Sequence, residues 1–208
     1  MQKISEGKNK KIHWKFSKCI KDESPIIDES IKLIPNHFGR VRVGTIKDRS
    51  IRADGILSKE KMTLIMKTAD CVPVIVYWPG GDWKAILHFG YKGLIFGLAE
   101  NFLRTVNQQE LNISKANFLL GPAICKKCYT HKTLLRKLKW RVLKFFQPKF
   151  AQTSNGQYEF DLMGATTHKL LEIGAKRSNI VSENSCTNCK FDVSRHYKMK
   201  DNVISTIG

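Results

Sequence analysis

Two residues with reactive side chains, Cys71 and His88, stand at the two ends of a predicted β-hairpin. The run Val72–Trp78 is almost entirely β-branched and aromatic, which predicts a strand buried on both faces. A turn over Pro79–Asp82 should return the chain into a second strand, Trp83–His88. An antiparallel pair places the start of its first strand beside the end of its second. We therefore expect Cys71 and His88 at one end of the sheet, where a thiolate and an imidazole could bind a metal or act as a nucleophile and its base.

The sequence around these two residues resembles a known family. The segment TADC, which ends at Cys71, is followed seventeen residues later by a His-x-Gly-aromatic-basic-Gly segment that begins at His88. This pair of motifs is similar to the laccase-domain or YfiH-like family, first described as multicopper polyphenol oxidases and now regarded as purine nucleoside phosphorylases. Four further segments lie in the family's order within residues 31–196, namely Ala53-Asp54-Gly55, Gly121-Pro122-Ala123-Ile124 with Cys128-Tyr129, Phe160-Asp161-Leu162 and Cys186-Thr187.

His37 is the third candidate of the site. The segment that contains it, residues 31–43, is similar to the family's Gln-x-His segment, with His37 in the histidine position and Pro35 where glutamine is usual. On the sequence alone, a single histidine in a loop is more often an ordinary surface residue. The resemblance implies instead that His37 joins Cys71 and His88.

These three residues form a donor set of two imidazoles and one thiolate. Such a set suits tetrahedral Zn²⁺ with its fourth position open to water, and zinc can lower the pKa of bound water from about 16 to about 7. A multicopper oxidase needs paired His-x-His motifs, whereas the six histidines here are scattered without such a pair. We therefore expect zinc at His37, Cys71 and His88, and not copper.

The resemblance implies phosphorolysis of purine nucleosides such as adenosine, inosine and methylthioadenosine to free base and pentose 1-phosphate, with adenosine deamination as a companion activity. Phosphate bound near the reacting carbon needs cationic side chains close to the metal. By position the candidates are Arg40 and Lys92, which complete an expected catalytic set with Cys71 and His88. Arg195, in a segment similar to the family's Ser-x-Arg-Arg, is a further candidate for binding substrate.

A cysteine hydrolase or deamidase is the first alternative. Cys71 and His88 have the residue types of a nucleophile and its general base, and the family's fold is similar to that of a toxin deamidase. In this hypothesis the thiol carries the chemistry without a metal. Alkylation of the thiol would then abolish activity.

A basic nucleic-acid-binding protein with structural zinc is the second alternative. Lys and Arg number 36 and Asp and Glu 18, for a formal net charge of +18, which favours anionic partners. Cys125-x-x-Cys128 and Cys186-x-x-Cys189 have the form of zinc-binding pairs, but 57 residues lie between them. The pairs would have to meet through the fold, so buried core thiols are the preferred interpretation. Nucleic acid is accordingly not an expected partner.

The composition is typical of a single α/β domain. With 208 residues, 42% of them hydrophobic, the chain can bury one substantial core. We expect a basic tail and short strand over residues 1–21, then one layered domain over residues 22–208, with mixed sheets covered by helices. No apolar run has the length of a membrane span and the first residues are too polar for a signal peptide, so a cytoplasmic protein is expected.

Helical spacing of apolar residues predicts three helices, over residues 93–106, 132–146 and 160–173. The second should pack its leucines on the sheet and turn its lysines and arginines to solvent. Further strands are expected at residues 41–43, 116–120 and 180–181. Residues 148–156 are predicted to be a polar linker.

Overall fold

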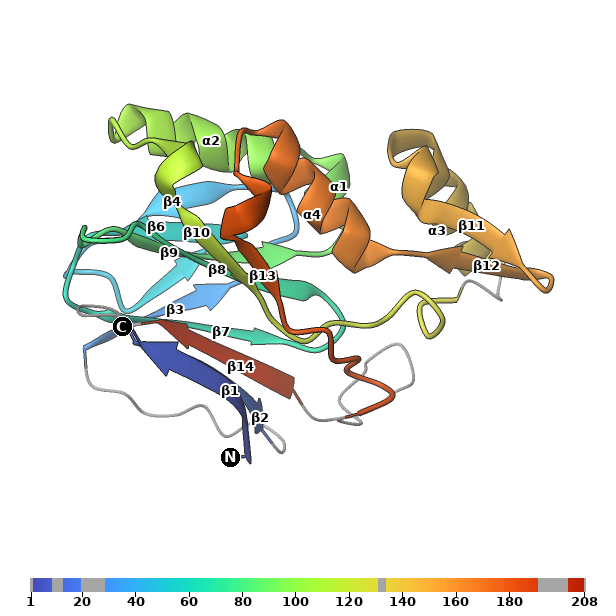
Figure 1. The fold of residues 1–208 in the computed structure, drawn as a ribbon, viewed down its shortest axis with the longest axis horizontal. Helices are drawn as coiled ribbons and strands as arrows, with labels where there is room; N and C mark the ends of the chain where they lie inside the picture. Colours follow the sequence, from blue (N-terminus) through green and yellow to red (C-terminus); the bar gives the residue numbers. More distant parts are fainter. Residues whose placement is uncertain (1, 9–12, 20–28, 131–133, 191–201, 208) are drawn as a thin grey trace.

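The computed structural model of the chain describes residues 2–8, 13–19, 29–130, 134–190 and 202–207. Within these ranges the chain forms two six-stranded mixed sheets, a small hairpin and four α-helices. Figure 1 shows three layers: an outer sheet, a central sheet, and helices on the far side of the central sheet. This arrangement confirms the expected α/β class.

The central sheet carries the predicted hairpin in its middle. Its strands are, in spatial order, β13 (Ile180–Ser182), β10 (Asn117–Leu120), β8 (Val72–Tyr77), β9 (Lys84–Phe89), β6 (Gly55–Ser58) and β4 (Val41–Val43). The pairs β10–β8, β8–β9 and β9–β6 are antiparallel, while β13–β10 and β6–β4 are parallel.

The outer sheet combines both ends of the described chain. Its strands are β1 (Gln2–Lys8), β2 (His13–Cys19), β14 (Asn202–Ile207), β7 (Thr63–Thr68), β3 (Ser30–Ile34) and β5 (Ser50–Arg52). The pairs β3–β7 and β3–β5 are parallel and the other three pairs are antiparallel.

Alternation along β8 explains the layers. Val74 and Val76 pack with the helices, whereas Ile75 packs with Leu64 and Met66 of β7 in the outer sheet. Successive side chains of a strand point to opposite faces. A strand with helices on one face and a second sheet on the other must therefore be apolar at nearly every position, which accounts for the unbroken run in the sequence.

The helices are α1 (Tyr91–Ile95), α2 (Leu98–Gln108), α3 (Leu134–Phe146) and α4 (Leu162–Glu172). The helix predicted over residues 93–106 is in fact α1 and α2, because Gly97 adopts a left-handed conformation with φ of 69° between them. Figure 1 shows α1, α2 and α4 over the central sheet, while α3 projects to one side with the small hairpin. Among the described residues, no helix is both long and apolar enough to cross a membrane.

The predicted orientation of α3 is wrong. Its leucines Leu134, Leu135 and Leu138 are 83%, 80% and 59% exposed, whereas Trp140 and Leu143 are buried. The Trp140 indole N–H donates to the Glu159 carbonyl at 2.9 Å, which anchors the helix on the hairpin and not on the sheet.

Two segments expected to be irregular form strands. Residues 151–160 make the hairpin β11 (Ala151–Ser154) and β12 (Gln157–Phe160), whose turn residues Asn155 and Gly156 have φ of 47° and 70°. Two consecutive left-handed residues are typical of the type I′ turn that Asn-Gly favours. The expected loose N-terminal tail is β1, which pairs with β2 over its length. β2 in turn pairs with β14, so tertiary strand pairing orders a polar segment that has little strand pattern of its own.

A prediction follows from the close contact between Gly121 and β2. A Cβ atom at Gly121 would lie 2.4 Å from Cε1 of Phe16, a ring that is 1% exposed and has no room to move. Gly121→Ala should lower the free energy of unfolding by about 1–3 kcal/mol in urea titration. Gly81→Ala is the matched control because its nearest atom would lie at 3.6 Å. Equal stability of the two variants would contradict the packing of β2 against the strand-end loop.

Candidate active site

The hairpin places Cys71 and His88 together, as the sequence predicts. Pro73 of β8 is paired with His88 of β9, and Cys71 lies two residues before Pro73. The Cys71 and His88 side chains are hydrogen-bonded. Gly90 allows this approach, because a Cβ atom there would lie 2.9 Å from the Cys71 sulfur.

Asp54 contacts both the His37 turn and His88. Its carboxylate accepts hydrogen bonds from the backbone N–H groups of His37, Phe38 and Gly39 at 2.8, 2.8 and 2.7 Å. It also lies 3.7 Å from Nδ1 of His88. Burial raises the pKa of Asp54, but the nearby His88 and the hydrogen bonds from the His37 and Gly39 backbone outweigh it and lower the pKa. The carboxylate is therefore charged, and it fixes both histidines at once.

His37 sits in a strained turn. Its φ of 63° lies in the left-handed region, which is costly for a residue other than glycine. The three N–H groups bound by Asp54 hold the turn in this conformation. The His37 and His88 rings then lie 5.1 Å apart between centroids.

A cavity of about 530 Å³ opens at this point, and His37, Cys71 and His88 all line it. The ligand atoms of His37, Asp54 and His88 lie within 4.8 Å of one another. Asp54 is 1% exposed and does not line the cavity, and its oxygens already bind the histidine turn. The Cys71 sulfur is not part of that group, but Cys71 lines the cavity together with the two histidines. Asp54 lies behind His88 and the His37 turn, a position from which a carboxylate can orient histidine ligands.

The surroundings of His88 favour its protonated form when no metal is present. Burial lowers the pKa of His88, but the interactions with Cys71 and Asp54 outweigh it and raise the pKa to about 9. A protonated imidazole beside a cysteine can stabilise the thiolate of an activated nucleophile. The same geometry thus suits both chemistries that the sequence leaves open.

Two lysines on the cavity wall were not among the residues predicted from the sequence. Lys32 of β3 and Lys67 of β7 line the cavity with His37 and Cys71. The parallel register of β3 and β7 brings these strands side by side. Lys67 immediately precedes TADC, so its place next to the motif was the available signal.

The predicted cationic residues lie elsewhere. Arg40 is exposed at the end of the His37 turn, and Lys92 is half-buried on α1. Neither is among the described residues that line the cavity, so their roles stay predictions. Arg195 lies outside the described residues.

Lys139 of α3 is a further cation near the site that the sequence did not indicate. Its Nζ lies 3.9 Å from the centroid of the Tyr91 ring and 4.6 Å from that of Tyr129. Burial lowers the pKa of Lys139 to about 8 against the opposing charges of Cys71 and Asp70. Tyr91 is the aromatic residue of the His88 segment, so this lysine links α3 to the edge of the site.

A second group of possible metal ligands lies in the loops that follow β10 and β13. Cys125, Cys128, Cys186 and Cys189 have sulfur atoms within 4.8 Å of one another. The two Cys-x-x-Cys pairs therefore do meet through the fold. Cys189 is exposed and Cys125 and Cys186 are half-buried, so the preferred interpretation as buried core thiols is wrong for three of the four.

Comparison with known proteins agrees with this picture. Residues 27–199 match the family described as multi-copper polyphenol oxidoreductase laccase. The chain belongs to this family. Its fold is also that of solved structures: a Neisseria meningitidis protein, NMB0706, is 16% identical with a TM-score of 0.79, covering 100% of this chain and 98% of that one. YlmD from Geobacillus stearothermophilus superimposes with a TM-score of 0.78 at 19% identity, over 96% and 92% of the two chains.

The curated relatives have names from purine metabolism. A purine nucleoside phosphorylase, YlmD of Geobacillus stearothermophilus, is 29% identical over 147 residues, or 66% of this chain and 51% of the relative. Campylobacter jejuni purine nucleoside phosphorylase Cj1217c is 28% identical over 80% of this chain and 69% of the relative. Adenosine deaminase RL5, from an unknown prokaryotic organism, is 23% identical over 60% and 48%. The chain spans about half the length of the first curated relatives it matches.

The role of Asp54 can be tested by substitution. Asp54→Asn removes the negative charge that lies beside His88 and behind the His37 turn. If the histidines bind a divalent metal, its affinity should fall roughly 10- to 100-fold in a competition with a chromophoric chelator. Asp48→Asn is the matched control, since Asp48 accepts N–H and O–H hydrogen bonds from Thr45 in an exposed turn. Unchanged affinity in Asp54→Asn would show that the carboxylate does not position the ligands.

Proposed function

We propose that this chain is a zinc-dependent purine nucleoside phosphorylase whose site is the cavity of His37, Cys71 and His88. The observation that carries the proposal is the set of residues that line the cavity. Three side chains of types that bind metals and two lysines, Lys32 and Lys67, share its wall. The names of the relatives supply the class of substrate.

The donor set fits zinc. Two imidazoles and a thiol are ligands that zinc accepts, and three protein ligands leave a position open for catalysis. His88 Nδ1 faces Asp54, so its other ring nitrogen is the one left for a metal. Zinc bound here would supply a Lewis acid within the cavity. Copper remains disfavoured, because the sequence has no His-x-His pair to gather several ions.

In the proposed reaction a phosphate oxygen attacks C1′ of the nucleoside, the bond from C1′ to the purine nitrogen breaks, and the base leaves with a proton. Lys32 and Lys67 attract the anion and hold it on the cavity wall. Cations placed where negative charge gathers lower the barrier in a partly desolvated site.

Product analysis decides among the possible reactions. Adenosine or inosine incubated with zinc-loaded protein should yield free base and ribose 1-phosphate only when phosphate is present. Base release without phosphate would identify a hydrolase instead. Ammonia and inosine from adenosine would identify a deaminase, the activity named for one relative.

A lysine series tests where the phosphate binds. Lys67→Ala should raise the KM for phosphate about tenfold or more, because a charge-assisted hydrogen bond contributes roughly 1.5–3 kcal/mol. Lys47→Ala, an exposed lysine in the loop after β4, is the matched control and should leave KM unchanged. If Lys92→Ala raised KM and Lys67→Ala did not, the position expected from the sequence would be the phosphate site.

A cysteine hydrolase is the second candidate, favoured by the Cys71–His88 hydrogen bond and the raised pKa of His88. The two candidates predict different responses to iodoacetamide. A nucleophilic Cys71 should be alkylated and inactivated in fully zinc-loaded protein, whereas a zinc-bound thiolate should be protected until a chelator is added. Cys71→Ser should abolish activity in both cases, but it should lower zinc content at this site only if Cys71 is a ligand.

A further inference from the structure

The four-cysteine cluster is built by the parallel pairing of β10 and β13. Phe118 is paired with Ile180 and Leu120 with Ser182, so both strands end at the same edge of the central sheet. A bridge between Ala123 and Cys186 extends the pairing beyond the strands. The two Cys-x-x-Cys turns follow directly, which is how two pairs with 57 residues between them in the sequence come to lie side by side.

Backbone hydrogen bonds hold each Cys-x-x-Cys turn in place. In the first, the N–H groups of Cys128 and Tyr129 donate to the Cys125 carbonyl at 3.0 and 2.9 Å. In the second, the N–H of Lys190 donates to the Cys186 carbonyl at 3.0 Å. These matching turns bring both cysteines of each pair to one side.

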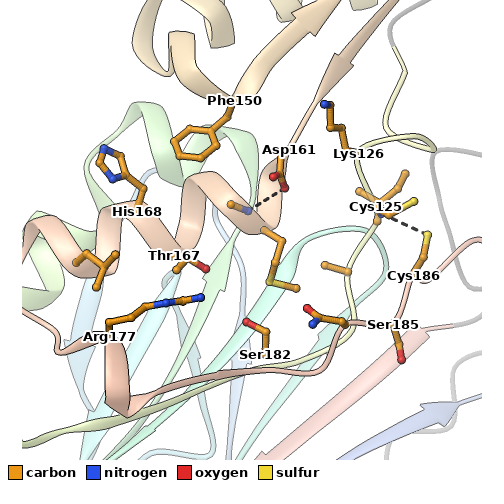
Figure 2. A pocket seen from close by; sticks show the side chains of 16 residues that line it. Cys125, Lys126, Phe150, Asp161, Thr167, His168, Arg177, Ser182, Ser185 and Cys186 are labelled. Atoms are coloured by element: carbon orange, nitrogen blue, oxygen red, sulfur yellow. Dashed lines mark hydrogen bonds between the residues drawn. The ribbon is translucent and has the colours of Figure 1, made fainter. Parts of the chain in front are cut away.

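N–H groups also point at the sulfur atoms. Cys186 Sγ accepts from the backbone N–H of Cys125 at 3.3 Å and of Cys189 at 3.4 Å, the first drawn as a dashed line in Figure 2. Cys128 Sγ accepts from the Asn188 side-chain amide at 3.4 Å. Hydrogen bonds to ligand atoms are the outer contacts that orient metal ligands.

The spacing and charge of the cluster suit a tetrahedral ion. Cys128 Sγ and Cys189 Sγ are 3.2 Å apart, and the four sulfurs lie within 4.8 Å of one another. Four sulfurs around zinc at 2.3 Å would be separated by about 3.8 Å, which falls within this range. Four thiolates and one zinc carry a net charge of −2, and Lys126, Lys127 and Lys190 lie in or directly after the turns.

We propose that Cys125, Cys128, Cys186 and Cys189 bind a second, structural zinc ion, separate from the site of His37, Cys71 and His88. Soft thiolates in tetrahedral array select zinc among the common divalent ions, and four protein ligands leave no position for substrate. Binding releases the protons of the thiols that are not already ionised. The ion would then join the two loops that follow the parallel strands, in addition to the backbone hydrogen bonds between them.

The position of the four-cysteine cluster indicates a structural role for an ion bound there. Cys125 and Cys186 form part of the wall of a cavity of about 600 Å³, which Figure 2 shows between α4 and the loops after β10 and β13. The same loop reaches the catalytic cavity, because the Ile124 N–H donates to the Asp70 carbonyl at 3.0 Å, next to Cys71. A zinc ion here would fix the loop that supports the Cys71 turn without taking part in the reaction.

Metal content per chain tests the proposal. Protein purified from zinc-supplemented cells without chelators should hold one zinc more than a Cys189→Ser variant, measured by plasma mass spectrometry. Cys189 is exposed, so its replacement removes a ligand with little change in packing. Cys189→His, which supplies another zinc ligand, should restore the lost ion.

Cobalt replacement provides a readout that does not depend on activity. Cobalt bound by four thiolates should give strong sulfur-to-metal charge-transfer and tetrahedral d–d absorption, reduced in Cys189→Ser. Zinc content equal in the wild type, Cys189→Ser and Cys189→His would overturn the proposal. A metal-free wild type whose mass is lower by four hydrogens would also overturn it, because two disulfides formed by an external oxidant would then occupy the cluster.

Discussion

The antiparallel pairing of β8 with β9 is the constraint on which the rest of the molecule depends. Both strands are buried on both faces, so their register decides which side chains meet the helices and which meet the outer sheet. A slip of one residue would exchange the two sets of side chains, sending Val74 and Val76 toward the outer sheet and Ile75 toward the helices. It would also separate Cys71 from His88. The same register of β8 and β9 is therefore required for packing of the core and for assembly of the site.

Asp54 connects this framework to the loop that carries His37. One buried carboxylate satisfies three backbone N–H groups and faces His88, so it compensates for its own burial with charge-assisted hydrogen bonds. These hydrogen bonds hold His37 in its left-handed conformation in spite of the cost of that conformation. Loss of the carboxylate would leave a strained turn and unpaired donors together, which is why its effect should exceed that of an exposed turn aspartate.

The sequence was sufficient where local pattern and fold agree. The β8–β9 hairpin, β4, β10 and β13 follow from apolar runs and turn residues, and motif order supplied the family and the fold. The orientation of α3 could not be predicted, because its stripe of leucines has the pattern of a buried face. In the structure Trp140 and Leu143, on another face of the helix, are the buried residues. Lys32 could not be predicted, because its place on the cavity wall depends on the pairing of β3 with β7, and neither strand reveals its partner. For Lys67 the adjacent TADC segment was a local signal. The Asn155-Gly156 turn, in contrast, carried a local signal of a hairpin.

The five cysteines whose side chains the structure describes occur in two environments, and the difference separates a candidate catalytic thiol from candidate structural ligands. Cys71 lies beside a histidine and an open cavity, so it has a partner for activation and space for a substrate. The four clustered cysteines lie close to one another, and an ion bound by all four sulfurs would have no coordination position left for a substrate. The loop that contains Cys125 nevertheless contacts the backbone of Asp70 beside Cys71. An ion in the cluster would act on the reaction through this contact, by holding the wall of the site and not by contacting substrate.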